Sequence, residues 1–197
     1  NNLKKCYIRP LVYRGYGQMG VDPTGAPVDV IIAVWPWDSY LGPDALENGV
    51  PVGVSSWRQR SINAIPPSMK SAASYMNSIL AKLEAKQHGY VEAIMLNEQG
   101  LVCEGTGENL FIVRDGVLST PPLSDGLLEG ITRDTILCLA DDLEIPAIEE
   151  SLTRSDLYIA DEVFFTGSAA ELTPIGSIDD RVIGKPGEIT RAIQERF

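Results

Sequence analysis

The stretch Cys103–Phe111, which reads CEGTGENLF, limits the folds open to this chain more than any other feature. It places two carboxylates, Glu104 and Glu108, around a Thr-Gly break and then continues into an apolar run that ends at Val113. Carboxylates rarely enter an apolar strand unless another group pairs with them. That partner could be a cationic cofactor ring, a structural arginine or a set of backbone N–H groups. Taken alone, the stretch favours a structural partner.

A lysine upstream, Lys70, lies in the segment IPPSMKSAASYMNSIL. Pro66 and Pro67 exclude a helix before them and suit the entry to one after them. From Ser68 onward the composition predicts a helix, so Lys70 is expected in a first turn, where the helix macrodipole disfavours a cation. The residues that follow are small and leave space for a ligand. Lys70 can therefore be an ordinary solvated lysine or a Schiff-base lysine, which needs a depressed pKa and such space.

A third segment, PPLSDGLLEGITRDTILCLADDL, has a turn-rich start, then Gly130, and then an amphipathic pattern from Ile131. Helix N-termini bind phosphate through free N–H groups and the dipole, and Thr132 would add a hydroxyl. Asp134 in the first turn also suits the start of any helix. By itself, this segment predicts a helix start and nothing more.

Together these segments resemble the branched-chain amino-acid aminotransferases, which are fold-type IV pyridoxal-phosphate enzymes. The resemblance runs in the same order through nearly all 197 residues, and several segments are long and specific. The matching segments are YIRPL (Tyr7–Leu11), QMGV (Gln18–Val21), DVIIAVWPWDSYLG (Asp29–Gly42), SSWRQR (Ser55–Arg60), IPPSMKSAASY (Ile65–Tyr75), CEGTGENLF, LLEGITRDTI (Leu127–Ile136) and ADEVFFTGSAAELTPI (Ala160–Ile175).

The chain also departs from that family at its ends. It begins with Asn1-Asn2 and has no counterpart of the N-terminal portion, which holds much of a small domain and an arginine for the cofactor phosphate. It stops at Phe197, in a segment that reads as a helix still running. We therefore expect an N-terminally truncated piece of a longer protein.

The resemblance implies pyridoxal 5'-phosphate as cofactor and a Schiff base on Lys70, which would also be the catalytic base and acid. It implies that Glu104 pairs with the pyridine nitrogen, because a carboxylate stabilises the ring proton that draws electrons from the substrate. The other cofactor-binding positions that it implies are Tyr75 beside the phenolic oxygen, Leu128 on the ring face, and Ile131, Thr132 and Ser168 around the phosphate. The family usually has threonine at the last of these positions, and serine keeps the hydroxyl.

The resemblance also implies a substrate-binding wall, formed by Tyr7, Arg9, Met19, Trp37, Tyr40 and Ala169. Arg9 is the candidate for the distal carboxylate of glutamate or 2-oxoglutarate. Simpler interpretations stay open, since Trp37 and Tyr40 could pack within a loop and methionine is a common gap-filler. Glu108 is not assigned a catalytic role, because it could serve the hairpin or a subunit contact.

The pattern of elements predicts an α+β protein with much antiparallel sheet. Asp115-Gly116 between two apolar runs is the strongest hairpin signal and predicts a type I′ turn. Strands are expected at 6–12, 29–34, 51–57, 92–96, 101–103, 111–113, 117–118, 147–152, 162–166 and 181–183, and helices at 69–87, 131–142 and 188–196. The resemblance implies a D-amino-acid aminotransferase-like fold, with the end of a small domain at 1–34, an interdomain loop at 35–45 and a large cofactor-binding domain at 46–197.

Composition limits the partners. The net charge of −11 argues against nucleic acid and against an anionic membrane surface. No apolar run reaches transmembrane length, and the single histidine offers no metal site. The three cysteines are odd in number and form no CxxC motif, which predicts reduced thiols and a cytoplasmic location.

The function that the resemblance implies is transfer of the amino group of L-leucine, L-isoleucine or L-valine to 2-oxoglutarate. Family members also lead us to expect a homodimer or a higher homo-oligomer. Two alternatives stay open: a D-amino-acid aminotransferase or aminodeoxychorismate lyase on the same fold, and a catalytically incomplete fragment. Substrate handedness would separate the first from the main interpretation.

Overall fold

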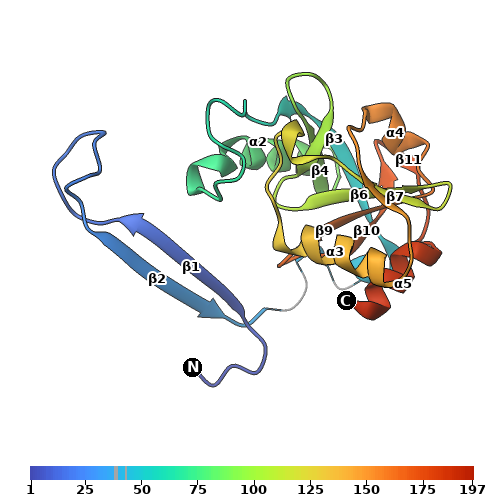
Figure 1. Cartoon of the computed structure of the whole chain (residues 1–197), viewed down its shortest axis with the longest axis horizontal. Coiled ribbons are helices and arrows are strands. Elements are labelled where there is room, and N and C mark those ends of the chain that lie inside the picture. The colour runs from blue at the N-terminus through green and yellow to red at the C-terminus, as the bar shows by residue number, and fades with distance from the viewer. Residues whose placement is uncertain (38–39, 43) are drawn as a thin grey trace. The chain divides into compact units, whose positions relative to one another are not determined.

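The computed structural model describes residues 1–37, 40–42 and 44–197, so part of the predicted interdomain loop (38, 39 and 43) lies outside the described residues. The chain divides into two compact units, Asn1–Ser39 and Tyr40–Phe197 (Figure 1). Among the described residues, no helix has both the length and the apolar character needed to cross a membrane.

The first unit is an antiparallel hairpin of β1 (Tyr7–Arg14) and β2 (Val28–Trp35). The register runs without interruption from Tyr7 opposite Trp35 to Arg14 opposite Val28. Both strands are rich in β-branched and aromatic residues, which suit a pleated backbone. These are the first two strands that the sequence predicted.

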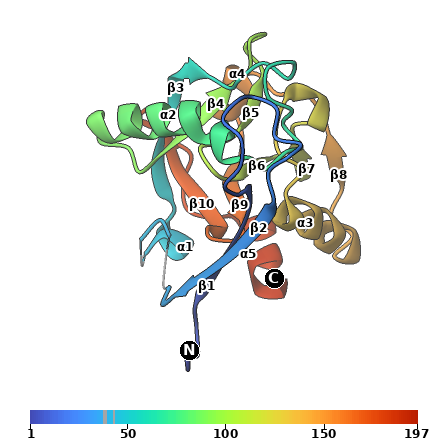
Figure 2. The same ribbon diagram turned by 90° about the vertical axis from the view of Figure 1, so that its left-hand side faces the viewer.

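The second unit is built on one curled, mixed sheet with the strand order β5-β4-β3-β10-β9-β6-β7-β8, in which β11 pairs with β10 (Figures 1 and 2). Three neighbouring pairs are parallel (β10 with β3, β3 with β4, β7 with β8) and the others are antiparallel. The strands are β3 (Val50–Arg58), β4 (Glu92–Leu96), β5 (Val102–Gly105), β6 (Asn109–Arg114), β7 (Val117–Thr120), β8 (Ala147–Glu149), β9 (Glu162–Gly167), β10 (Glu171–Ile178) and β11 (Arg181–Val182).

Helices flank this sheet, which confirms the predicted α+β class. They are α1 (Ala45–Asn48), α2 (Tyr75–Gln87), α3 (Ile131–Asp142), α4 (Arg154–Tyr158) and α5 (Glu188–Arg196), with 3-10 turns at Ala72–Ser74 and Leu123–Asp125. The bounds of α3 and α5 are those that the sequence predicted.

Strand β6 explains why an apolar run follows the two glutamates. Side chains alternate along a strand, so Leu110 and Ile112 face one core cluster, with Phe165, while Phe111 and Val113 face another, with Phe164. The second cluster includes side chains from α3 and α5, which pack on that face of the sheet (Figure 2). A strand that is buried on both faces reads as a continuous apolar run instead of an alternating one.

The predicted turn between β6 and β7 is confirmed. Asp115 has φ 51° and Gly116 has φ 78°, and positive φ at both central residues defines the type I′ turn. Glycine reaches this conformation without strain, and aspartate tolerates it better than most residues.

The predicted start of the first long helix is wrong. Residues 69–71 are not helical, and α2 begins at Tyr75 after the 3-10 turn Ala72–Ser74. The hydroxyl of Ser71 accepts a hydrogen bond from the N–H of Ala73 at 3.2 Å, so this serine caps the turn. Lys70 therefore precedes the helical segment and does not lie in a first helical turn, where the sequence had predicted it.

Strand β10 was missed because Pro174 lies within it, and proline normally argues against a central strand. The structure shows how it is accommodated. Glu171–Pro174 pairs with β9, whereas the pairing with β3 begins at Ile175. The missing N–H of Pro174 thus falls where the strand changes partners. Helices α1 and α4 were also missed, and the strand predicted at 147–152 ends at Glu149.

Candidate functional site

Glu104 lies near the end of β5, half-buried, with three hydrogen-bond donors around its carboxylate. The side-chain amide of Gln59 donates to Oε1 at 2.5 Å. The backbone N–H of Leu128 and the side-chain amide of Asn109 both donate to Oε2, at 3.1 and 3.4 Å. All three donors are neutral, so the carboxylate is held in place without a direct ion pair in the described part of the chain.

The environment of Glu104 shifts its acidity in two directions. Burial raises the pKa of its carboxyl to about 7, because little water is left to solvate the charge. The hydrogen bonds from Leu128 and Gln59 and the positive charges of Arg60 and Lys70 act against that rise. The pKa of Glu104 therefore lies close to neutral pH, and the charge of Lys70 acts on this carboxyl.

Lys70 is exposed and lies in the irregular segment before the cap at Ser71. Its ammonium nitrogen is 5.8 Å from the centre of the Tyr75 ring, at the start of α2. The positive charge of Lys70 also acts against the rise in the pKa of Glu104, and all three residues belong to the second unit.

Helix α3 begins beside this carboxylate. Its N-cap is Gly130, which supplies no side-chain hydrogen bond to the first turn, so the leading N–H groups keep their capacity to bind an acceptor. Ile131 is exposed there, and Thr132 is buried with its hydroxyl in the first turn. The structure confirms the predicted helix start, and the binding of a phosphate there, which the family resemblance implies, stays a prediction.

Asn109, the first residue of β6, connects Glu104 to that helix start. Its amide nitrogen donates to the carbonyl of Leu128 at 2.9 Å as well as to Glu104. The side-chain oxygen of Asn109 lies so close to Gly130 that a Cβ added there would be 2.0 Å from this oxygen. Sequence reasoning missed Asn109 and Gln59. The only available signal for Asn109 was a polar side chain at the start of an apolar strand.

Ser168 and Ala169 lie in the turn between β9 and β10. Ser168 is exposed and Ala169 is half-buried. Thr166, two residues before Ser168, stands opposite Asn109 in the register of β9 and β6. The turn thus follows directly from the strand that neighbours the carboxylate-binding segment.

The predicted substrate wall divides between the two units. In the first unit, the Tyr7 ring lies 5.2 Å from Trp35 and 4.9 Å from Trp37, and Arg9 donates to the Tyr7 hydroxyl at 3.3 Å. Met19 belongs to the loop between β1 and β2 and is fully exposed. The structure therefore groups Tyr7, Arg9 and Trp37 but leaves Met19 outside that group.

Tyr40 belongs to the second unit, where its ring lies 5.5 Å from the ammonium of Lys82. The same ammonium pairs with the fully buried Glu92 at 2.5 Å. Glu92 in turn accepts a hydrogen bond from the Thr106 hydroxyl at 2.7 Å. A polar network around the buried Glu92 therefore supports the turn between β5 and β6 through Thr106.

Glu108 is buried in the same turn and accepts a hydrogen bond from the N–H of Gly107 at 3.0 Å. Burial, together with the nearby charge of Glu92, raises the pKa of Glu108 to about 8. Glu108 thus lies in the turn that follows Glu104 and is hydrogen-bonded within that turn.

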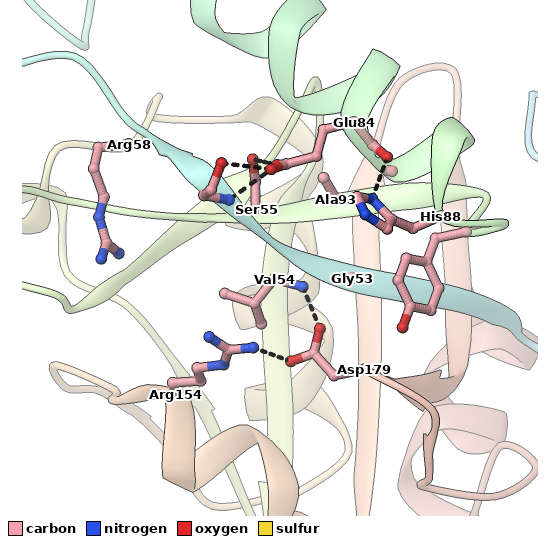
Figure 3. Close-up of a pocket in the computed structure, with 12 residues that line it drawn as sticks. Gly53, Val54, Ser55, Arg58, Glu84, His88, Ala93, Arg154 and Asp179 are labelled. Carbon is pink, nitrogen blue, oxygen red and sulfur yellow. Dashed lines mark hydrogen bonds and ion pairs between the residues drawn. The ribbon is translucent and has the colours of Figure 1, made fainter.

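A hollow of about 470 Å³ lies elsewhere on β3 and α2 and contains none of the predicted site residues (Figure 3). Several of its polar groups pair with one another. Glu84 accepts from the hydroxyl of Ser55 at 2.5 Å, and Asp179 accepts from the N–H of Val54 at 2.8 Å and from Arg154 at 2.6 Å. Within the described ranges, no group of His, Cys, Asp and Glu side chains could hold a metal ion.

Comparisons with known proteins agree with this arrangement. Residues 1–178 match the family described as "Amino-transferase class IV". The branched-chain-amino-acid aminotransferase of Escherichia coli (strain K12) is 49% identical over 200 residues, which are 100% of this chain and 65% of that protein. This chain therefore spans about 65% of the length of that relative.

Solved structures give the same result. The crystal structure of the Escherichia coli branched-chain amino acid aminotransferase matches with a TM-score of 0.97 and 49% identity, over 99% of this chain and 65% of that one. The T.th. branched-chain amino acid aminotransferase with pyridoxamine 5'-phosphate matches with a TM-score of 0.90 and 44% identity, over 97% and 63%. These neighbours confirm the predicted fold-type IV class. Since the family match covers most of the sequence, this chain belongs to the class IV aminotransferase family.

Proposed function

We propose that this chain forms the larger part of a pyridoxal-phosphate-dependent branched-chain amino-acid aminotransferase. The observation that carries the proposal is the grouping of a lysine, a carboxylate held by neutral donors and an open helix N-terminus in one unit. The names of the relatives support the substrate class. The T.th. relative has also been solved with N-(5'-phosphopyridoxyl)-L-glutamate and with 4-methylvaleric acid.

The donor set of the second unit fits this cofactor. The amine of Lys70 suits its aldehyde carbon, the carboxylate of Glu104 suits its ring N–H, and the start of α3 at Ile131 and Thr132 suits its phosphate. Ser168 would add a hydroxyl to the phosphate site, and Leu128 would pack on the ring. When bound, pyridoxal phosphate supplies the electron sink that allows the Cα proton of an amino acid to leave.

We propose that Lys70 moves that proton. Among the described residues no carboxylate forms an ion pair with Lys70, so its amine is not held away from the site. The amine would hold the cofactor until the amine of the substrate replaces it there, and the freed amine of Lys70 would then take the proton from Cα of the substrate and return it to C4′. Tyr75, whose ring lies beside the amine, would place a hydroxyl next to the phenolic oxygen.

Glu104 would keep the ring nitrogen protonated. Its hydrogen bonds from Gln59, Asn109 and Leu128 favour the ionised form, which accepts the ring N–H. A charged partner at that nitrogen favours withdrawal of electrons from the substrate Cα.

The substrate side of the proposal concerns Tyr7, Arg9, Met19, Trp37, Tyr40 and Ala169. Arg9 is exposed and contacts the ring and hydroxyl of Tyr7, an arrangement that leaves donors of its guanidinium able to meet the second carboxylate of 2-oxoglutarate or glutamate. We also propose that residues 1–34 are the end of a small domain and 46–197 a large cofactor-binding domain. Assembly as a homodimer or higher oligomer, in the cytoplasm, completes the proposal.

An absorption titration tests this function. The purified protein is mixed with pyridoxal phosphate, then with L-leucine and finally with 2-oxoglutarate. The proposal predicts an absorption band of lysine-bound cofactor that shifts with L-leucine and returns with 2-oxoglutarate. A band that responds to D-alanine but not to L-leucine would contradict the substrate class, and the absence of any band would contradict cofactor binding by this chain.

A further inference from the structure

Gln59 contacts Glu104 from a position fixed by the sheet. It follows β3 directly, and its backbone N–H donates to the carbonyl of Leu96 in β4 at 2.8 Å. Its side chain is buried, with 3% of its surface exposed. Its amide nitrogen donates to Oε1 of Glu104 at 2.5 Å. This is the donor on the opposite carboxylate oxygen from Leu128 and Asn109.

The other end of the Gln59 amide faces Arg60. The Gln59 oxygen accepts from the backbone N–H of Arg60 and from Nη1 of its guanidinium, both at 3.2 Å. The same Nη1 lies 3.4 Å from the carbonyl of Ser74. Arginine can only donate, so the amide oxygen must face it, and the amide nitrogen must then face the carboxylate. The orientation of the amide is therefore dictated by its two neighbours.

We propose that Gln59 is a positioning residue for Glu104, which fixes the carboxylate and links it to Arg60 without an ion pair. The role of Glu104 toward a cofactor ring rests on the proposed function, but the hydrogen bonds of Gln59 do not. A guanidinium in direct contact would occupy both carboxylate oxygens in the bidentate arrangement that arginine prefers. The amide occupies one position on Oε1 and leaves capacity for a further donor.

The chain of bonds from Arg60 through Gln59 to Glu104 also has a direction. A cation that donates to an amide oxygen polarises the amide and strengthens its N–H as a donor. Gln59 thus stabilises the ionised form of Glu104 and passes on part of the effect of Arg60. The other charged groups that act here are Lys70, which also favours ionisation, and the neighbouring carboxyl Glu108, which opposes it when charged.

The test is a carbon-13 NMR titration of the Glu104 carboxyl in the whole chain without pyridoxal phosphate, with its signal assigned by its loss in Glu104→Gln. Gln59→Met keeps the length of the side chain but removes the donor, so the pKa of Glu104 should rise by about one unit. Gln87→Met, on the exposed surface of α2, is the matched control and should leave that pKa unchanged. An unchanged or lowered pKa in Gln59→Met would overturn the proposal.

Two further variants guard against misfolding and test the link to Arg60. If Gln59→Met does not fold, Gln59→Asn retracts the amide by one methylene and should raise the pKa of Glu104 in the same direction. Arg60→Met should raise it too, and by less when Gln59 is already Met, because linked groups are not additive. Equal effects of Arg60→Met in both backgrounds would overturn the link.

Pyridoxal phosphate binding separates this proposal from the proposed function. Loss of the positioning bond should weaken the affinity for pyridoxal phosphate by about tenfold in Gln59→Met. If the pKa of Glu104 shifts as expected but neither Gln59→Met nor Glu104→Gln changes that affinity, the positioning role stands and the proposed function fails.

Discussion

Glu104 is half-buried, and three neutral donors reach its carboxylate. Replacing it in Glu104→Gln keeps the size of the side chain and removes the charge that would hold a ring proton. We expect kcat/KM for L-leucine to fall by about thirtyfold or more, which corresponds to about 2 kcal/mol for a lost charged hydrogen bond. Steady-state kinetics checks this. Glu98→Gln, on an exposed turn, is the control, and equal rates in both variants would contradict the role.

Glu108 makes a prediction about stability and pH. Its pKa is raised to about 8 by burial and by the charge of Glu92, against an ordinary value of 4.5. The folded state therefore binds this proton more tightly than the unfolded chain does. The contribution of Glu108 to stability is complete below about pH 4.5 and is lost as the pH rises through about 8.

In Glu108→Gln this loss should disappear. Between acidic and alkaline pH, the free energy of unfolding should then decrease by on the order of 2 kcal/mol less than in the parent chain. Urea unfolding on both sides of the window measures it. Glu195→Gln, exposed near the end of α5, should keep the pH dependence of the parent chain. If Glu108→Gln behaved like that control, Glu108 would not be the titrating group.

At the same scale, the sequence identifies charged site residues better than neutral ones. Lys70 and Glu104 stood out because a charge near small or apolar neighbours needs a reason. Gln59 and Asn109 hold the same carboxylate, but an uncharged amide breaks no pattern and gives no such signal. Their roles depend on which strands become neighbours, and that is decided by the sheet.

Among the elements, the start of α3 depends on a close approach of two segments. A Cβ at Gly130 would lie 2.0 Å from the side-chain oxygen of Asn109, so Gly130→Ala must displace Asn109 from Leu128 and Glu104. We expect a loss of about 2 kcal/mol in the free energy of unfolding and weaker binding of pyridoxal phosphate. Denaturant unfolding and a binding titration measure both effects.

Gly25→Ala is the control for that variant, because a Cβ there meets nothing within 4 Å. It should leave unfolding and binding almost unchanged. If Gly130→Ala bound pyridoxal phosphate as tightly as Gly25→Ala does, the start of α3 would not form part of the site.

The last helix is held by a side chain from the sheet. Glu162 in β9 accepts from the backbone N–H groups of Ile189 and Thr190, at 3.3 and 2.8 Å, and so caps α5. Glu162→Gln removes a negative charge from a helix N-terminus and should lower the free energy of unfolding by about 1 kcal/mol. Thermal unfolding monitored by circular dichroism tests this. The control is Glu188→Gln, which removes an exposed charge from the first turn of α5 and should have a smaller effect. An equal loss in the two variants would argue against the cap.

Element boundaries followed the sequence where one signal dominated and failed where two competed. The type I′ signal of Asp115-Gly116 located the hairpin of β6 and β7, whose strands are longer than predicted, and the clean pattern from Ile131 gave the bounds of α3. At the start of α2, the capping hydroxyl of Ser71 prevailed over helix-favouring neighbours. In β10 a proline hid a strand whose change of partners only the folded sheet reveals.

Across the whole molecule, the two units bury apolar side chains differently. The second unit buries apolar clusters on both faces of its sheet, whereas in the hairpin Ile8, Val12 and Ile32 remain 60–65% exposed. The family resemblance, more than any local pattern, predicted the fold of the second unit. The sequence could not predict which neutral side chains meet at its carboxylate, because these contacts join β3, β5, β6 and the segment before α3.

Covalent labelling tests the proposal that Lys70 carries the cofactor. The whole protein is mixed with pyridoxal phosphate, reduced with borohydride, weighed intact and mapped by peptide mass spectrometry. We expect one added phosphopyridoxyl group per chain, on the peptide that contains Lys70, and its loss in Lys70→Arg. The other five lysines should remain unmodified. A label on another lysine, or one spread over surface lysines with Lys70 unmodified, would contradict the account.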